Sequence, residues 1–544
     1  MHVPKEVNGI LRTLRKSGFQ AYLVGGCVRD ILLKGIYPEL VEGPKDWDIA
    51  TNAKPEEIQK LFPDSVYENE FGTVGVKVKN AIDVLNDIDE KGGRLERAQR
   101  SNKCSDRTST APGIVEVTTF RKESAYTDKR HPDKIIFAKT IEDDLSRRDF
   151  TVNAMALGWG SASTSSSTKE KIVDGISTEN ETMVAFKDLQ LVDPYNGQKD
   201  LKEKIIRAVH DPDERFNEDA LRLMRAVRFA AELDFNIEEK TGIAMLKHSG
   251  LLEAIAKERI RDEFAKIIIC DRAKDGLQML EDYGLMRHVM PELREGIDCG
   301  QNKHHIYTVW EHNLRALDYS AQKNYSLAVR LASLLHDVGK PRSKRGEGPD
   351  STFYGHDAIG AKMTLKIMDR LHFGKELTEK VAHLVRYHLF YYNVGEVTEA
   401  GVRRFLRRVG PENIDDLIKV READRIGSGV PKAVPYKIRH LLFMIEKVKR
   451  DPISPKMLKI HGEEVMKIAE LLPGPKVGAI LAVLLEEVIE DPKRNTVGYL
   501  AERTADLAKL SEKELAALAE KAKETKEEFE AGVEEEIKKK HYVK

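Results

Sequence analysis

Strand-like sequence is confined to the amino-terminal part of this 544-residue chain. Short apolar or alternating runs indicate strands at 21–24, 46–50, 73–79 and 114–120. From about residue 200 to the end, apolar residues instead recur at three- and four-residue spacing, which is typical of amphipathic helices. The pattern therefore predicts an α+β multidomain protein in which a sheet-containing head is followed by helical domains.

Changes in composition divide the chain further. At ~100–200 residues per domain, a chain of this length holds three or four domains. A polar stretch and a Gly/Ser/Thr-rich stretch indicate insertions. The expected parts are a head at 1–157 with an insertion at about 80–112, a flexible insertion at 158–188, a helical neck at 189–275, a histidine-rich helical body at 276–432, a tail at 433–505 and a charged carboxyl-terminal helix at 506–544.

The overall charge and apolar content limit the partners of the chain. Lysine and arginine total 89 and aspartate and glutamate total 90, so the formal net charge is −1. A polyanionic partner must therefore be held by local basic patches. With 41% hydrophobic residues and 33% charged residues, the composition argues against a membrane protein. Four cysteines without a CxxC pair, and an amino terminus without signal-peptide features, predict a reducing cytoplasm.

A glycine pair follows the first expected strand. Gly25 and Gly26 lead into a helix expected from about residue 28, and Arg29 lies in its first turn. Such a turn lets the backbone approach a phosphate closely and directs helix N–H groups toward it. Arg29 can add two hydrogen bonds to the same phosphate. Glycine pairs also occur in many ordinary turns, so this motif alone predicts little.

Three acidic residues add weight to a phosphate site. Asp46 and Asp48 alternate along the second expected strand and therefore point the same way. Glu116 lies in a strand that can be a neighbour of the first. Acids grouped in this way bind Mg²⁺ together with substrate phosphates, although a pair of solvated aspartates is the commoner meaning of a lone DxD. Three acids downstream of a phosphate turn are typical of two-metal nucleotidyl transfer.

These segments, taken together, resemble a known family. GGCVRD at 25–30, DWDIAT at 46–51, VEVTTFR at 115–121 and RRDFTVNAM at 147–155 occur in the order seen in class II tRNA nucleotidyltransferases, the CCA-adding enzymes. The resemblance implies a head like that of DNA polymerase beta, with a mixed sheet. It also implies Asp46 and Asp48 as Mg²⁺ ligands, with Glu116 as a third catalytic acid. The residues implied to bind nucleotide in the head are Gly25, Gly26, Arg29, Arg147, Arg148 and Asp149.

A second motif is expected to choose the incoming base. We predict one helix over 217–228, in which Asp219 and Arg222 are surface neighbours three residues apart. A carboxylate accepts from an exocyclic amine and a guanidinium donates to a ring nitrogen or carbonyl, so this pair can admit CTP and ATP. An ordinary surface salt bridge is the alternative. The resemblance implies a base-reading role for Asp219 and Arg222, and Arg225 and Arg228 continue the series at three-residue steps. Because each such step rotates around the helix, Arg228 is expected on nearly the opposite face from Asp219, toward phosphates or solvent.

A third set of residues predicts a metal centre. His312, His336-Asp337 and Asp424 follow the order H…HD…D, which resembles the HD superfamily of metal-dependent phosphohydrolases. Imidazole and carboxylate ligands suit a divalent transition metal, whose identity the ligands do not fix. His356, with His388 or alternatively His383, can hold a second metal. The resemblance implies hydrolysis of phosphoesters at RNA 3′ ends.

The expected function is addition of CCA to tRNA from CTP and ATP. A segment at 126–133 occupies the place of the loop that family members adding all three nucleotides possess. Basic clusters at 257–261 and 403–408, with the turn at 473–478, are expected to hold the tRNA by its shape. Two alternatives stay open: a poly(A) polymerase or A-adding enzyme of the same family, and an HD phosphohydrolase whose head only docks RNA. The sequence predicts no oligomeric state.

Overall fold

The structure, a computed structural model, divides into two compact units, Met1–Val289 and Met290–Lys544. Each unit is described by itself. Four expected segments lie wholly or partly outside the described residues. They are the insertion at about 80–112, the insertion at 158–188 beyond residue 159, the loop at 126–133 and the charged helix beyond residue 518. The described residues are 3–38, 43–44, 46–67, 72–78, 113–124, 134–159, 189–302, 306–448, 454–511, 514–515 and 517–518.

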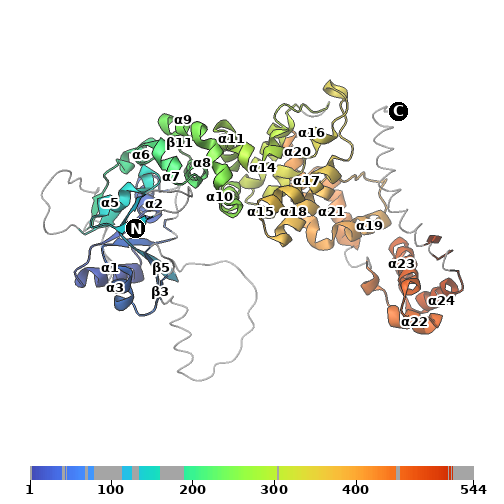
Figure 1. The fold of residues 1–544 in the computed structure, drawn as a ribbon. Coiled ribbons are helices and arrows are strands. Elements are labelled where there is room, and N and C mark those ends of the chain that lie inside the picture. The colour runs from blue at the N-terminus through green and yellow to red at the C-terminus, as the bar shows by residue number, and fades with distance from the viewer. Residues whose placement is uncertain are drawn as a thin grey trace, which may run out of the picture. The chain divides into compact units, whose positions relative to one another are not determined.

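The head of the first unit is built on one mixed sheet. Its described strands lie in the order β3-β4-β5-β2-β1-β8-β9. Figure 1 shows part of this sheet, with β3 and β5 labelled, in the blue amino-terminal part of the ribbon near α1 and α3. β2 lies in the middle of the sheet, antiparallel to β1 and parallel to β5. The strands of the sheet are β1 (Ala21–Val24), β2 (Asp48–Thr51), β3 (Ser65–Tyr67), β4 (Thr73–Lys77), β5 (Ile114–Thr119), β8 (Ala156–Gly158) and β9 (Gln190–Val192). A separate hairpin is formed by β6 (Arg121–Ser124) and β7 (Lys134–Phe137).

Strands form at the four expected places, and the alternating runs at 73–79 and 114–120 pair with each other. β4 and β5 pair antiparallel, so the insertion between them leaves the two strands side by side. One boundary was wrong: the strand expected at 46–50 begins at Asp48, and Asp46 lies in a bend before it. The helices of the head are α1 (Lys5–Lys16), α2 (Gly26–Ile36), α3 (Pro55–Leu61) and α5 (Ile141–Ser146), with a 3₁₀ turn at Thr151–Asn153.

A helical neck completes the first unit. Asp200 joins it to the head, because its carboxylate accepts from Thr151 Oγ1 at 2.6 Å and from Arg207 Nε at 3.1 Å. The elements of the neck are α6 (Gly197–Glu203), β10 (Ile205–Ile206), α7 (Pro212–Glu218), α8 (Leu221–Leu233), β11 (Asn236–Ile237), α9 (Glu239–His248), α10 (Lys257–Ile269), α11 (Ala273–Asp282) and α12 (Met286–Val289).

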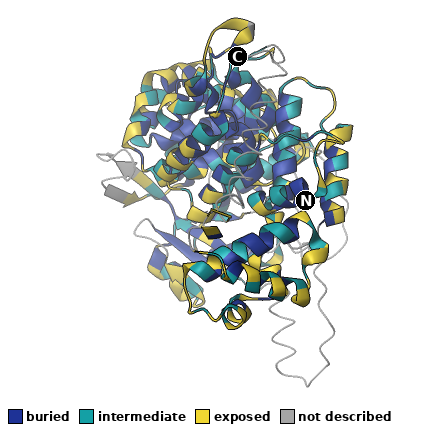
Figure 2. Ribbon diagram, turned by 90° about the vertical axis from the view of Figure 1, so that its right-hand side faces the viewer, coloured by how far each residue is buried: buried dark blue, intermediate teal, exposed yellow. Residues whose placement is uncertain are grey.

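The named elements in the described residues of the second unit are all helices. Its central helix α15 is apolar along most of its length and nearly all of it is buried, packed against α14, α18 and α20. Figure 2 shows buried residues in dark blue along the inner faces of the helices and exposed residues in yellow on their outer faces. A separate apolar core holds the last three helices together. The helices are α13 (Pro291–Arg294), α14 (Val309–Gln322), α15 (Leu327–Leu335), α16 (Lys340–Ser343), α17 (His356–Arg370), α18 (Lys375–Tyr387), α19 (Glu399–Val409), α20 (Ile414–Gly427), α21 (Tyr436–Val448), α22 (Gly462–Ala469), α23 (Pro475–Glu490) and α24 (Val497–Ala508).

No helix in the described parts of the chain is both long and apolar enough to cross a membrane.

Candidate active site and metal centre

The glycine turn, an acidic residue and an arginine meet at the end of β1. Gly25 has a φ of +75°, a conformation that suits glycine, and α2 begins at the next residue. A Cβ on Gly25 would lie 2.8 Å from Arg148 Nη1 and 3.6 Å from Asp48 Oδ2. The predicted phosphate turn, metal ligand and RRD arginine are therefore in contact, although 123 residues separate Gly25 from Arg148 (148 − 25).

The acids lie on neighbouring strands. Asp48 and Glu116 are register partners in the parallel pair β2–β5, so their side chains project from the same face of the sheet. Asp46 is exposed in the bend just before β2. Burial and the charge of Asp46 raise the pKa of Asp48, while the nearby Arg148 acts in the opposite direction. A bound cation would remove this penalty, and carboxylates near a phosphate turn are the ligands that Mg²⁺ prefers.

The two arginines of the RRD motif are held by one buried acid that sequence reasoning missed. Asp144 accepts from Arg147 Nε at 3.0 Å and from Arg148 Nη2 at 3.3 Å. Although burial acts to raise it, the pKa of Asp144 is lowered by these two guanidinium groups. The spacing of three and four residues was the available signal, because such residues are neighbours on a helix.

The remaining head residues link the site to the neck. Arg29 donates to Asn153 Oδ1 at 3.0 Å. Asp149 accepts from Arg225 Nη2 at 2.6 Å, and this pairing outweighs burial and lowers the pKa of Asp149 to about 2. Asp149 and Arg225 thus form an ion pair between the head and α8, whereas the guanidinium of Arg148 lies beside the Gly25 turn.

Substitution of Gly25 tests the turn. Because Gly25→Ala places a methyl group 2.8 Å from Arg148 Nη1 and strains the positive φ, we expect it to lower kcat/KM for nucleotide addition at least about tenfold. Gly35→Ala is the matched control, since Gly35 lies in α2 and a Cβ added there would have nothing within 4 Å. Equal activity of the two variants would contradict the placement of the phosphate at this turn.

The base-reading motif differs from its prediction. The single helix expected over 217–228 was wrong: α7 ends at Glu218 and α8 begins at Leu221. Asp219 lies between them and accepts from Arg259 Nη2 at 3.0 Å and from the backbone N–H of Leu221. This hydrogen bond gives an acceptor to a backbone N–H at the start of α8, and it favours a break between α7 and α8.

The arginines of this motif also have protein partners. The guanidinium of Arg222 donates to Glu218 Oε2 at 2.5 Å and to the carbonyl of Arg147 at 3.1 Å, so this side chain contacts the RRD motif rather than the carboxylate of Asp219. Arg228 is 9% exposed and pairs with Glu263 at 2.5 Å. This burial contradicts the expectation that Arg228 faces phosphates or solvent.

The basic cluster at 403–408 is tied to the tail helix. Arg403 is buried and donates to the carbonyl of Ile489, and Arg404 pairs with Glu486 at 2.6 Å. At 257–261, Arg259 is engaged by Asp219. These arginines hold helices together, and their protein partners argue against a role for them as RNA contacts.

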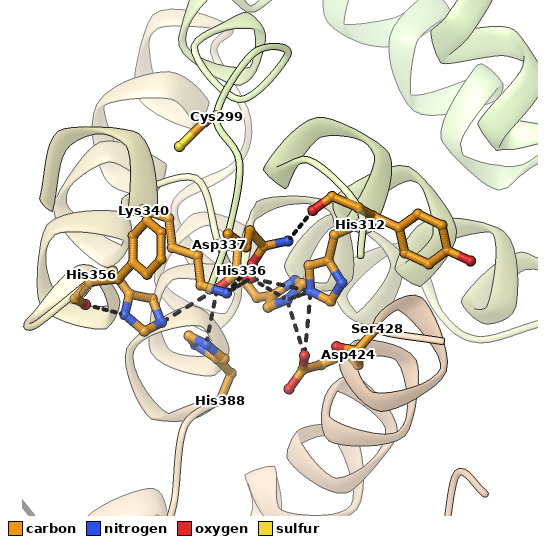
Figure 3. Close-up of polar contacts among 12 residues, drawn as sticks. Cys299, His312, His336, Asp337, Lys340, His356, His388, Asp424 and Ser428 are labelled. Carbon is orange, nitrogen blue, oxygen red and sulfur yellow. Dashed lines mark hydrogen bonds and ion pairs between the residues drawn. The ribbon is translucent and has the colours of Figure 1, made fainter. Parts of the chain in front are cut away.

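Histidines and carboxylates converge in the second unit, as Figure 3 shows. His312 Nε2 and His336 Nε2 are 2.8 Å apart, and Asp424 Oδ1 lies 3.4 Å from His312 Nε2. Asp337 Oδ2 lies 3.2 Å from His312 Nε2. These atoms form a first group that fits a metal, and the predicted H…HD…D set is brought together.

A second group shares one carboxylate with the first. Asp337 Oδ1 lies 3.4 Å from His356 Nε2 and 3.7 Å from His388 Nε2. These atoms are mutually within 4.8 Å and form, with the first group, the candidate metal sites of the described residues. Asp337 therefore presents one oxygen to each group. The alternative ligand His383 is elsewhere, with Nε2 at 2.6 Å from the carbonyl of Val409.

Hydrogen bonds orient the imidazoles. Nδ1 of His336, His356 and His388 lies 2.7–2.8 Å from a backbone carbonyl three residues earlier. An Nδ1–H donated to a carbonyl leaves Nε2 with a free lone pair, which is the arrangement seen in metal-ligating histidines.

The charges of Asp337 and His388 fit a metal, whereas a metal at His336 must displace a proton. Although burial lowers it, the pKa of His336 is raised to about 10 by the carboxylates of Asp337 and Asp424. Burial would raise the pKa of Asp337, but Lys340 and His336 hold it well below its usual range. Burial and the neighbouring His336 lower the pKa of His388 to about 3. An ionised carboxylate and a neutral imidazole are the protonation states that metal binding requires. Lys340, which the sequence analysis missed, lies 2.6 Å from Asp337 Oδ2 and donates to Gln301.

Close backbone packing positions Asp337 against His356. A Cβ on Gly339 would lie 2.2 Å from the carbonyl oxygen of His356 and 2.6 Å from the nitrogen of Gly360. Glycine at 339 therefore allows the HD turn to contact α17.

We expect Gly339→Ala to destabilise the second unit by about 3 kcal/mol, since overpacking against backbone cannot be relieved by a rotamer change. The melting transition of this unit should fall by about 6–12 °C in calorimetry. Gly374→Ala, with nothing within 4 Å, should leave the transition in place. A melting temperature unchanged by Gly339→Ala would refute the close packing.

Three family models match the chain. The model described as "Poly A polymerase head domain" matches residues 21–108 and 86–207. "Probable RNA and SrmB- binding site of polymerase A" matches 234–297, and "HD domain" matches 309–428. The matches cover both candidate sites.

Curated relatives match most of the chain. The CCA-adding enzyme of Lactococcus lactis subsp. lactis is 38% identical over 488 residues, which cover 89% of this chain and 93% of that enzyme. The A-adding tRNA nucleotidyltransferase of Deinococcus radiodurans is 34% identical over 360 residues, 64% of this chain and 75% of that enzyme. The solved CCA-adding enzyme of Bacillus stearothermophilus in complex with CTP shares the fold, with a TM-score of 0.61 at 23% identity over 93% of this chain and 98% of its own. The chain therefore belongs to the family of CCA-adding and A-adding tRNA nucleotidyltransferases, and it carries an HD domain.

Proposed function

We propose that this nucleotidyltransferase adds CCA to the 3′ end of tRNA in the cytoplasm, with CTP and ATP as substrates. The observation that supports the proposal most is the contact of Gly25, Asp48 and Arg148 at the end of β1. The L. lactis relative, which carries the name CCA-adding enzyme over nearly its full length, supports the choice of product.

In this proposal the head residues hold the triphosphate and the RNA end. Asp46 and Asp48 would hold Mg²⁺, which when bound would supply Lewis-acid stabilisation of the phosphates and lower the pKa of the attacking hydroxyl. The N–H groups at Gly25 and Gly26 and the guanidinium of Arg29 bind phosphate oxygens. Arg148, fixed by Asp144, neutralises charge beside Asp48. Glu116 adds a third carboxylate on the same sheet face.

Base choice is proposed to use the break between α7 and α8. Asp219 offers a carboxylate that accepts from the amine common to cytosine and adenine, and Arg222 offers a donor to the adjacent ring nitrogen or carbonyl. Here Arg259 holds Asp219 and Glu218 holds Arg222. The incoming base must therefore compete with these two ion pairs. The carbonyl of Arg147 accepts from Arg222, and this hydrogen bond links base choice to the RRD motif.

Incorporation assays test this function. With tRNA that ends at the nucleotide before CCA, CTP alone should add two residues, ATP alone should add none, and both together should add CCA. UTP and GTP should be refused. Addition of a single A only to tRNA already ending in CC would instead establish an A-adding enzyme, and homopolymeric A tails on many RNAs would establish a poly(A) polymerase.

A second activity, hydrolysis of phosphoesters, is proposed for the HD domain. The two ligand groups favour it, with one Asp337 oxygen 3.2 Å from His312 Nε2 and the other 3.4 Å from His356 Nε2. Paired divalent metals can clamp the attacking and leaving oxygens of a phosphoester. The ligand set suits Mn, Fe, Co, Ni or Zn alike. Hydrolysis of a 2′,3′-cyclic or terminal phosphate, lost with a chelator and restored by one of these metals, would support the activity. No hydrolysis with any of them would contradict it.

A further inference from the structure

An aromatic surface begins next to the HD ligands and continues along α21. Tyr436, His440 and Phe443 are spaced four and three residues apart and therefore share one face of this helix. Their rings follow one another, with centroids of Tyr436 and Phe443 at 5.9 and 6.1 Å from that of His440. Tyr436 is 62% and Phe443 is 63% exposed, which is high for large rings. We call Tyr436, His440 and Phe443 the aromatic face.

The segment that follows the ligand His388 contacts this face. Tyr392 lies four residues after His388, at most about 14 Å along extended chain. Its hydroxyl is 2.6 Å from His440 Nδ1, and the rings of the two residues are 5.9 Å apart. A nucleic acid strand on the aromatic face therefore lies within a few nucleotides of the metal ligands.

A second contact connects the surface to the other side of the site. Phe390 lies between His388 and Tyr392 and is faced by the guanidinium of Arg421 at 5.9 Å from the ring centroid. Arg421 also donates to the ligand Asp424 at 2.5 Å. Phe390 is therefore linked through Arg421 to the ligand Asp424 on α20. It also follows the ligand His388, at the end of α18, by two residues.

Positive charges accompany the exposed rings. Lys437 and Arg439 are exposed on α21 and Lys432 is exposed just before it, while the exposed acid of this helix, Glu446, lies near its far end. Rings flanked by cations suit a single strand of RNA, since bases stack on rings and cations attract phosphates. A protein interface would instead concentrate apolar residues and few charges at its centre.

We propose that the aromatic face binds the single-stranded 3′ end of RNA and presents its terminal phosphate to the HD metal centre. The inference rests on the proposed HD activity and names the substrate class of that site: an RNA end of several unpaired nucleotides rather than a mononucleotide. Stacking on one ring contributes about 1–3 kcal/mol per base.

The test compares a long and a short substrate on the full chain. The long one is a 5′-labelled eight-nucleotide RNA that ends in CCA with a 2′,3′-cyclic phosphate, so the head cannot extend it. The short one is 2′,3′-cyclic AMP, which fills only the metal site. With Mn²⁺, Tyr436→Ala/Phe443→Ala should raise KM for the octamer at least about tenfold, the effect of one lost stacked base, and leave kcat/KM for cyclic AMP unchanged.

Two matched variants complete the comparison. Phe443→Trp with Tyr436→Phe keeps both rings and should keep the wild-type KM. Leu365→Ala removes an apolar side chain that is 42% exposed on α17, and it should also be neutral. An octamer KM that the double alanine variant leaves unchanged overturns the proposal. The proposal is also overturned if the only effect of Tyr436→Ala/Phe443→Ala is a loss of self-association in sedimentation. The aromatic face would then be an interface between copies of this chain.

Photo-cross-linking separates this proposal from that of HD hydrolysis. The same octamer with 5-iodocytidine should cross-link to α21 of the wild-type chain, and the double alanine variant should remove the adduct. This result supports the surface even if neither substrate is hydrolysed, in which case the hydrolase proposal fails alone. Adducts confined to the first unit overturn the aromatic face as an RNA site, whatever the hydrolysis result.

Discussion

Asp48→Asn is expected to reduce nucleotide addition by about a thousandfold, equivalent to about 4 kcal/mol of lost transition-state stabilisation. The amide would keep the shape of the side chain but remove the charge that holds Mg²⁺ beside the triphosphate. Because burial and Asp46 raise the pKa of Asp48, the charge of this carboxylate opposes folding, and the amide should not lower the stability of the fold.

Single-turnover addition of labelled CTP to trimmed tRNA measures this effect. Asp64→Asn, an exposed aspartate of the same head, is the control and should retain wild-type rates. Hydrolysis by the HD domain should continue in Asp48→Asn. If Asp48→Asn instead added nucleotides normally while HD variants abolished all activity, the head would be only an RNA-docking module.

The second large effect concerns Asp337. Because its two oxygens face separate ligand groups, Asp337→Asn should remove metal from both groups and lower phosphoester hydrolysis by about a thousandfold. Metal content per chain, measured by mass spectrometry after dialysis, should fall from two transition-metal ions to none. Nucleotide addition should be unaffected.

A variant of the second ligand group alone distinguishes two explanations for the loss of both ions from Asp337→Asn. One is that both metals share the carboxylate of Asp337, and the other is that the domain unfolds. His356→Ala should lose one ion and keep the other, because Asp337 remains together with His312, His336 and Asp424. Retention of both ions by Asp337→Asn would show that Asp337 is not shared. Loss of both ions from His356→Ala would show that the two groups do not bind independently.

Local patterns allowed much of both sites to be predicted. The Gly25–Gly26 turn follows from glycine's access to positive φ between an apolar strand and a helix, and both elements form there. The order of His312, His336-Asp337 and Asp424 resembles the HD superfamily, which implied a shared metal centre, and these residues do converge. In each case the residue type itself restricts the local backbone or the chemistry.

The remaining differences arise from contacts between distant segments. Nothing near Asp219 indicates that Arg259, forty residues later, holds its carboxylate, or that the helix breaks there. Arg228 was expected on the surface, because helix drift says nothing about Glu263 on a neighbouring helix. Arg403 and Arg404 have the spacing of a solvated basic face, but the tail helix α23 covers them. Pairing partners of this kind depend on tertiary packing, which periodicity does not encode.

The most direct test of the central claim is a crystal structure of the chain with CTP and Mn²⁺, with the metal located by anomalous scattering. The account predicts a metal peak between the carboxylates of Asp46 and Asp48, with the triphosphate on the Gly25–Gly26 turn beside Arg148. A triphosphate bound elsewhere, with no metal at these two aspartates, would contradict it.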